Sequence, residues 1–281
     1  MRLIPFALLL AAAVAAAQTP TPTPPLAAPP AQNPPPAAAP PPPSAPATPP
    51  TPPAWARIPA NAISSGILDG AGGWQWNHDP YTGGATQPTS NYPIYPDGRE
   101  GFAGRQFVAP YSGGPHTGAL WHLAFGADSR AQHFAYTAKV YLVTPEQIEN
   151  VEMDMNQVMN DGRTVILALQ CAGGSKTWEY TTVSDNATHW HPSNVACNPA
   201  TWGMKKWHKV ALYTERDSAG NVTYDGVCFD DNCQAFQGAA GPSVLALHWD
   251  PHELLLNYQT DAAQATGIMD SYLRDLEIFR W

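Results

Sequence analysis

Charged residues, and basic residues above all, are scarce in this chain. Only 13% of its 281 residues are charged, and 14 Lys and Arg stand against 23 Asp and Glu, which gives a formal net charge of −9 at pH 7. An acidic chain with so few basic residues disfavours phosphate backbones and other anionic polymers as partners. We therefore expect no nucleic-acid partner, and the composition favours a neutral ligand.

Long apolar runs are also lacking. The apolar stretch from Ile4 to Val14 follows Arg2 and precedes three alanines at 15–17, which is the pattern of a secretory signal with its cleavage site. This stretch is too short to cross a bilayer, although an uncleaved N-terminal anchor is the alternative interpretation. We predict a signal peptide over residues 1–17, no membrane insertion after cleavage, and a secreted protein, either extracellular or periplasmic.

Cysteine is rare, with four examples at Cys171, Cys197, Cys228 and Cys233. An even number in an exported chain indicates disulfide bonds. Cys228 and Cys233 bracket a predicted hairpin tip, so we expect them to pair with each other, and Cys171 is then left to pair with Cys197. A four-cysteine zinc site is the alternative, but the paired C-x-x-C spacing of such sites is missing.

The chain also lacks the motifs of several enzyme classes. No Gly-rich phosphate loop precedes a helix, and no G-x-S-x-G elbow is present. Nine histidines are present, but neither His189-Trp190-His191 nor the pair His248 and His252 matches a zinc signature. We predict no cofactor and no metal site.

Proline is abundant, and 18 of the 31 prolines lie between Thr19 and Pro53. A segment made almost wholly of Pro, Ala and Thr cannot bury a core and favours an extended polyproline conformation. We predict a disordered linker over residues 18–53 that spaces a domain from a surface or is an inert tail. The remaining residues, 54–281, are enough for one domain with a sizeable core, and we expect a monomer.

Strand patterns dominate this domain. The clearest runs from His133 to Leu142, where apolar residues alternate with polar ones, and one short helical turn is expected after Thr144. Many strands with one apolar face each predict two packed antiparallel sheets. We expect strands at Gly104–Tyr111, Ala119–Phe125, Gln132–Leu142, Asn150–Val158, Thr164–Cys171, Thr177–Val183, His208–Glu215, Asn221–Phe229, Leu254–Thr260 and Ser271–Trp281.

The most informative strand contains Glu152-Met153-Asp154-Met155-Asn156. Strand side chains alternate between faces, so Glu152, Asp154 and Asn156 project to one side and the two methionines to the other. A solvated outer face is the plainer interpretation of these polar residues. If the face lines a groove, it presents carboxylate and amide acceptors that suit sugar hydroxyls.

Three motifs together resemble the concanavalin A-like lectin and glucanase superfamily. Glu152-x-Asp154 resembles the Glu-x-Asp-x-Glu strand of family sixteen glycoside hydrolases. Trp207-His208-Lys209-Val210, followed by Tyr224-Asp225-Gly226, is similar to a hairpin of laminin-G-like domains, and the closing run from Ser271 to Trp281 resembles the family's last strand. The resemblance covers most of residues 100–281. It implies an all-β, two-sheet antiparallel jelly-roll sandwich.

The resemblance leaves the enzymatic activity open, because the superfamily holds both binders and enzymes. It implies that Glu152 would be the nucleophile of a retaining glycosidase and Asp154 its helper. The general-acid position holds Asn156, or Gln157 if the strand carries a bulge, and an amide cannot act as that acid. An acid from elsewhere, such as Glu179 or Asp185, could substitute. A structural calcium ion is a family-level option, with Asp69, Asp270 or Asp275 as conceivable ligands.

We therefore predict a secreted, non-catalytic carbohydrate-binding domain for a neutral polysaccharide or other glycan. The alternatives are a retaining β-glucanase-like hydrolase and a structural or adhesion domain of the laminin-G-like type. The expected binding residues are the three polar residues of the central strand, a cation on a neighbouring strand that pairs with them, and two tryptophans in a loop-rich segment at 172–202: Glu152, Asp154, Asn156, Lys139, Trp178 and Trp190.

Overall fold

The structure is a computed structural model, and it describes residues 51–96, 103–247, 249–250 and 252–281. The predicted signal peptide and nearly all of the predicted linker lie outside these residues. In the described part of the chain, no helix has the length and apolar character needed to cross a membrane.

Ten antiparallel strands form the first sheet, sheet A. Its main path runs β14 (Asn232–Ala235), β13 (Asn221–Phe229), β12 (Trp207–Arg216), β7 (His133–Leu142), β18 (Thr266–Arg280), β5 (Gly104–Ser112) and β3 (Ala85–Thr86). Three short strands pair beside this path: β1 (Ile63–Ser64) on β18, β4 (Thr89–Ile94) on β5, and β15 (Ala240–Pro242) on β13.

Eight antiparallel strands form the second sheet, sheet B. Its path runs β11 (Ala187–Ala196), β10 (Thr177–Ser184), β9 (Thr164–Ala172), β8 (Ile148–Val158), β17 (Glu253–Ala262), β6 (Gly118–Ala127) and β2 (Gln75–His78). The short strand β16 (Val244–Leu245) pairs with β9. The strand that carries Glu152 is therefore central, with three strands on either side of it along this path.

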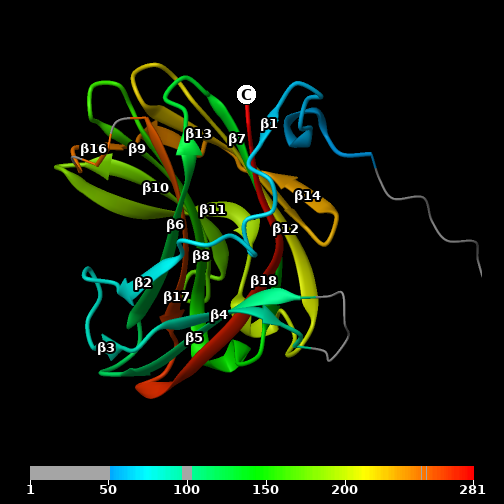
Figure 1. Cartoon of the computed structure of the whole chain (residues 1–281), viewed down its shortest axis with the longest axis vertical. Coiled ribbons are helices and arrows are strands. Elements are labelled where there is room, and N and C mark those ends of the chain that lie inside the picture. Colours follow the sequence, from blue (N-terminus) through cyan, green and yellow to red (C-terminus); the bar gives the residue numbers. More distant parts are fainter. Residues whose placement is uncertain (1–50, 97–102, 248, 251) are drawn as a thin grey trace, which may run out of the picture. The chain divides into compact units, whose positions relative to one another are not determined.

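The two sheets pack face to face, and Figure 1 shows them as two curved layers, with β9, β8 and β17 in one and β12 and β18 in the other. Their inner faces form one hydrophobic core that includes Phe107 and Val140 from sheet A and Trp121, Leu169 and Tyr258 from sheet B. The all-β, two-sheet antiparallel sandwich predicted from the sequence is confirmed.

The strand predictions differ from the structure mainly at residues 172–202. This segment was expected to be rich in loops, but β10 and β11 form a long hairpin across most of it. The expected helical turn is a 3-10 turn, η2 (Pro145–Gln147), and the Thr144 side chain does not cap it. Instead Thr144 Oγ1 donates to Ile268 O (3.0 Å) and accepts from Asp270 N (3.0 Å), which ties the turn to β18.

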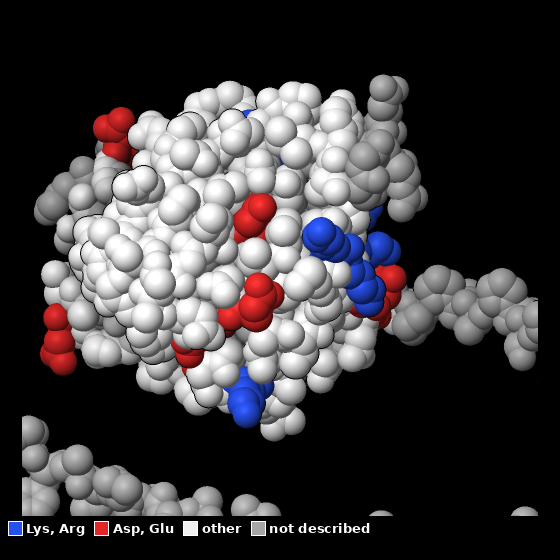
Figure 2. Space-filling view, turned by 90° about the horizontal axis from the view of Figure 1, so that it is seen from below, with Lys and Arg blue, Asp and Glu red and all other residues white. Residues whose placement is uncertain are grey.

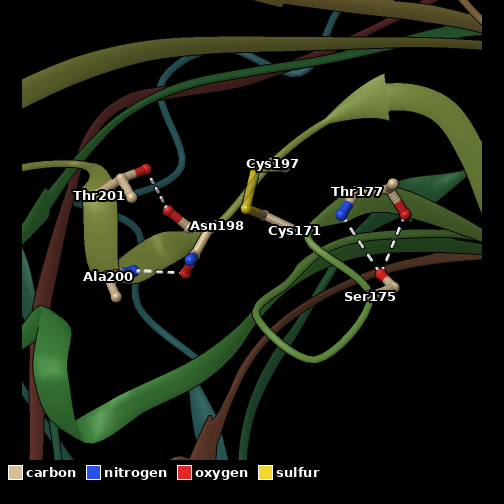
Figure 3. The surroundings of a disulfide bond; sticks show 7 residues. All are labelled: Cys171, Ser175, Thr177, Cys197, Asn198, Ala200 and Thr201. Carbon is tan, nitrogen blue, oxygen red and sulfur yellow. Dashed lines mark hydrogen bonds between the residues drawn. A yellow bond between two sulfur atoms is a disulfide. The ribbon is translucent and has the colours of Figure 1, made fainter.

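Both predicted disulfide bonds are present, one for each sheet. Cys171 on β9 joins Cys197, just after β11, so the bond holds the β10–β11 hairpin against the core. Figure 3 shows that the chain turns immediately after Cys197, where Asn198 Oδ1 accepts from Ala200 N. In sheet A, Cys228 on β13 joins Cys233 on β14 across their hairpin.

Candidate functional site

The central strand β8 places its polar residues on one side of sheet B. Met153 and Met155 point into the core, where they meet Tyr136 and Leu212 from sheet A. Every residue from 150 to 158 pairs one-for-one with β9, so this part of the strand carries no bulge and the alternation is unbroken. The polar residues of this part that face away from the core are Asn150, Glu152, Asp154 and Asn156.

This unbroken register decides between Asn156 and Gln157 for the third position. Gln157 points toward the other sheet, where its Nε2 donates to Asp128 O (2.8 Å) and its Oε1 accepts from Arg216 Nε (2.8 Å). Both ends of its amide are therefore used in hydrogen bonds within the fold. Asn156 is the residue that shares a face with Glu152 and Asp154.

Cross-strand pairing extends this polar face over most of the sheet. Residues directly opposite each other in antiparallel strands share a face. The row through Glu152 crosses six strands, from β10 to β2: Glu179, Gln170, Glu152, Gln259, Leu120 and Asn77. The row through Asp154 runs Ala168, Asp154, Asn257, His122 and Gln75. We call these outward-facing residues of sheet B, with Asn156, the polar face.

Exposure on the polar face falls from the edges to the middle. Asn77 at one edge is exposed and Glu179 near the other is half-buried, whereas Glu152 is 9%, Asp154 5% and Asn156 2% exposed. The β8 residues are therefore the most deeply buried part of the polar face.

Four carboxyl groups gather in this buried part of the face, those of Glu152, Asp154, Asp261 and Asp79. Asp261 on β17 and Asp79 after β2 both accept from Gln259 Nε2, at 3.1 and 3.2 Å. Asn150 Nδ2 donates to the other oxygen of Asp261 (2.9 Å). These amide donors hold the acids in place. Among the described residues, no Lys or Arg forms an ion pair with Asp79, Glu152, Asp154 or Asp261.

Burial without a nearby cation favours protonation of these acids. Burial first, and then the neighbouring Asp154 carboxylate, raise the pKa of Glu152 well above its ordinary value. Burial also raises the pKa of Asp154 to about 7, although hydrogen bonds from Glu152 and Asn257 act in the opposite direction. The pKa of Asp261 rises to about 6 for the same main reason. Glu152 is therefore the proton-bearing partner and Asp154 the acceptor.

Three polar atoms of the face are buried and lack a hydrogen-bond partner among the described residues: Asp154 Oδ1, Asn156 Oδ1 and His122 Nδ1. Burial lowers the pKa of His122, so its imidazole is kept neutral. An unsatisfied buried acceptor costs about 1–3 kcal/mol. These are hydrogen-bonding positions on one face that no described residue fills.

The structure corrects the prediction for Lys139. This residue lies on β7 in sheet A, on the face turned away from the core, and its Nζ pairs with Asp275 Oδ2 (2.6 Å). The sequence interpretation placed its strand next to β8, but β7 lies between β12 and β18. Lys139 therefore neither neutralises Glu152 and Asp154 nor belongs to their site.

The two tryptophans have different positions. Trp178 is 1% exposed and packs in the core beside Trp202 (6.3 Å between ring centroids), so the prediction that it stacks on a ligand is wrong. Its side chain points into the core, as does that of Cys171, its partner on β9. Trp190 on β11 stands opposite Thr181, on the same side of the hairpin as Glu179, and it is half-buried. Trp190 is thus an aromatic ring at the rim of the polar face.

Sequence reasoning missed several members of this face. On β17 the polar residues Asn257, Gln259 and Asp261 repeat at a spacing of two, which is the same signal that drew attention to β8. Gln170 follows a run of apolar residues near the end of β9. Its Nε2 donates to Glu179 Oε2 (2.6 Å), which fixes the outer acid relative to the inner one.

The aspartates considered for calcium have protein partners instead. Asp69 Oδ1 accepts from Leu276 N (3.0 Å), Asp270 Oδ1 accepts from Gln106 Nε2 (3.1 Å), and Asp275 pairs with Lys139. Within the described ranges, no group of three or more His, Cys, Asp or Glu side chains is arranged to hold a metal ion.

No protein family model and no curated protein matches the chain. Solved structures with a similar arrangement include lectin UEA-II complexed with galactose, at 9% identity over 79% of this chain and 98% of that one, with a TM-score of 0.36. The CBM2 module of Lactobacillus casei BL23 phage J-1 evolved Dit gives 14% identity, 78% and 96% coverage, and a TM-score of 0.40. The binding domain of botulinum neurotoxin DC gives 12% identity and a TM-score of 0.37, and the match covers 69% of this chain and 43% of that one. Likeness at this level does not extend to function.

Proposed function

We propose that this domain binds a neutral carbohydrate on the polar face of sheet B and does not cleave it. The observation that carries the proposal is the pair of buried acceptors without partners among the described residues, Asp154 Oδ1 and Asn156 Oδ1, at the most deeply buried part of the polar face. Sugar hydroxyls are donors that could satisfy both atoms.

The other groups of the face suit the same ligand. A protonated Glu152 is a donor, and amides such as Gln170 and Asn257 both donate and accept. The half-buried Trp190 offers a flat apolar ring at the rim, as sugar sites often do. None of the residues in the two rows is Lys or Arg, so an anionic sugar would meet only acids and neutral groups.

A retaining cleavage mechanism fits the geometry poorly. That mechanism needs an ionised nucleophile and a protonated acid whose carboxyl groups are about 5–5.5 Å apart. Here Glu152 is the group that keeps its proton, and the third position of the strand holds an amide, Asn156. The roles that the family resemblance implies are therefore not available to these residues.

One observation favours a second candidate, an inverting hydrolase. Glu179 lies in the same row as Glu152, two strands away, which places their backbones about 9.5 Å apart. Inverting glycosidases hold an acid and a base about 6.5–9.5 Å apart, with room for water between them. Glu152 would then be the general acid and Glu179 the general base.

Binding and cleavage can be tested together on the purified chain. We would measure gel retardation and new reducing ends with soluble β-glucans, xylans and galactans. Retardation without new ends is the expected result. Asp154→Ala and Asn156→Ala should each weaken binding about 10- to 100-fold, the size expected for losing a hydrogen bond to a buried acceptor, while the melting temperature stays close to that of the parent chain.

Asp161→Ala is the matched control, because it removes an exposed acid in the turn after β8 and should leave retardation unchanged. Absence of retardation by every polysaccharide would sink the proposal. New reducing ends that disappear in both Glu152→Gln and Glu179→Gln would replace it with the inverting hydrolase.

A further inference from the structure

A groove of about 850 Å³ lies on the opposite side of the molecule, on the outer face of sheet A. One wall is the segment Thr51–Pro53 with Ala56, and the other is the hairpin tip between β13 and β14. A second hollow of about 350 Å³ extends it toward Trp207 and Arg274. The two hollows share Lys139, Lys209, Asp230 and Asp231, so they form one elongated trough.

Basic side chains line this trough in register. Lys209 on β12 stands directly opposite Lys139 on β7, which stands opposite Arg274 on β18. Neighbouring strands are about 4.8 Å apart, and like charges at this distance destabilise a sheet. Lys206 lies beside them. Four of the 14 basic residues of an acidic chain therefore meet in this trough.

Each of the three lysines pairs with an aspartate, and the pair leaves donors of the ammonium group unused. Lys139 pairs with Asp275 (2.6 Å), Lys209 with Asp231 (3.2 Å) and Lys206 with Asp230 (3.8 Å). An ammonium group has three donors, so each lysine can also bind a ligand oxygen. In Figure 2 most of the visible basic side chains gather in one group with acidic side chains beside it, whereas the other acidic groups are scattered.

The floor of the trough indicates the shape of the ligand. Thr137 and Ala211 give it small side chains, with Tyr213 as a larger one. The strands beneath it, β7 and β12, are each paired on both sides. A peptide therefore cannot add a strand to β7 or β12 by main-chain pairing. A flat, elongated ligand that is recognised through its substituents fits better.

We propose that this trough binds an oligosaccharide that carries carboxylate groups, such as a uronate oligosaccharide. Its carboxylates meet Lys139, Lys206 and Lys209, and its apolar ring faces lie over the small floor residues. The site is separate from the polar face, because the hydrophobic core lies between them. The net charge of the whole chain opposes long anionic polymers, so short oligosaccharides are the ligands to use.

The test compares trigalacturonate with galactotriose, by calorimetry on the full chain at low and high salt. Trigalacturonate should bind at least tenfold more tightly than galactotriose at this site, and salt should weaken it. The double variant Lys139→Ala/Lys209→Ala should lose trigalacturonate binding at least tenfold, because charge-assisted hydrogen bonds are the strong ones. Asp154→Ala, on the polar face, should leave it unchanged.

The control is Arg130→Ala/Arg163→Ala, which removes the same charge away from the trough and should bind trigalacturonate like the parent. Melting temperatures show that each variant is folded. Equal binding of the two trisaccharides, or an equal loss in the control, overturns the proposal. An Asp- and Glu-rich peptide that competes as well as trigalacturonate also overturns it, since the ligand would then be a peptide.

Discussion

The outer faces of the two sheets carry the same kinds of acidic side chain in opposite situations. On sheet B, Glu152 and Asp154 are buried in the middle of the polar face, with amides around them and no described cation beside them. On sheet A, Asp231 and Asp275 are exposed and each pairs with a lysine. Residue type alone does not decide how an acid behaves here. Depth does, because a buried acid is driven toward its neutral form and an exposed one stays solvated.

The difference also separates two ways of presenting polar groups to a ligand. Sheet B keeps acceptors such as Asn156 Oδ1 buried and without partners, which suits hydroxyl donors. Sheet A keeps charges in contact with water, where they can exchange one partner for another at low cost. We therefore propose neutral sugars for the first face and acidic sugars for the second.

The largest expected effect compares the disulfide bonds of the two sheets. The Cys171–Cys197 bond closes a sequence separation of 26 residues and the Cys228–Cys233 bond one of 5. Closing a longer loop removes more entropy from the unfolded chain, so Cys171→Ala/Cys197→Ala should cost about 3.5 kcal/mol and Cys228→Ala/Cys233→Ala about 2 kcal/mol. Denaturant unfolding of the two variants measures both values. Equal losses would contradict the loop-length account of the two bonds.

The second effect is a pH dependence to which the buried acids of sheet B contribute. Burial raises the pKa of Asp154 to about 7 and that of Asp261 to about 6, from an ordinary value of 3.8. Between about pH 4 and pH 7 the folded chain therefore holds protons that the unfolded chain has lost. Stability should fall as pH rises through this window, by up to about 1.4 kcal/mol per pH unit for each retained proton.

Unfolding at several pH values measures this slope. Glu152→Gln/Asp154→Asn should flatten it, because neither side chain then titrates. What remains comes from Asp261 and from Asp225 on β13, whose pKa burial also raises to about 7. Asp275→Asn is the control on sheet A, where the aspartate is half exposed and ion-paired, and it should leave the slope unchanged. If the parent chain instead gains stability from pH 5 to 7, the acids of sheet B are not held in their neutral form.

Much of the fold could be predicted from the sequence, because alternation reports directly on a strand with one apolar face. It succeeded for β7 and β8, where polar and apolar residues alternate through much of the strand. It failed for β11, whose residues read as a polar loop because most of them are exposed on this outermost strand. An outermost strand is specified by pairing with its neighbour and needs little apolar pattern of its own.

The candidate site was only partly predictable, because the alternation within a strand does not say which strands lie next to it. Glu152, Asp154 and Asn156 could be placed on one face because they share a strand. Lys139 was assigned to that face on an assumed neighbour relation, which the structure corrects. Likewise, the alternation in Thr177–Ser184 does not show which side of the strand faces the core. Trp178 was therefore predicted to contact a ligand, whereas its side chain is buried in the core.

The smallest effect concerns the ion pair between Lys139 and Asp275 on sheet A. The Lys139 side chain is 30% exposed and that of Asp275 50%, so both ions remain hydrated and their attraction is screened. Lys139→Ala should cost less than about 1 kcal/mol of stability, and the loss should shrink further at high salt. A double-mutant cycle with Asp275→Ala isolates the pair. A coupling energy of several kcal/mol would mean that this pair behaves as a buried one, and the contrast between the two faces would then rest on partners rather than depth.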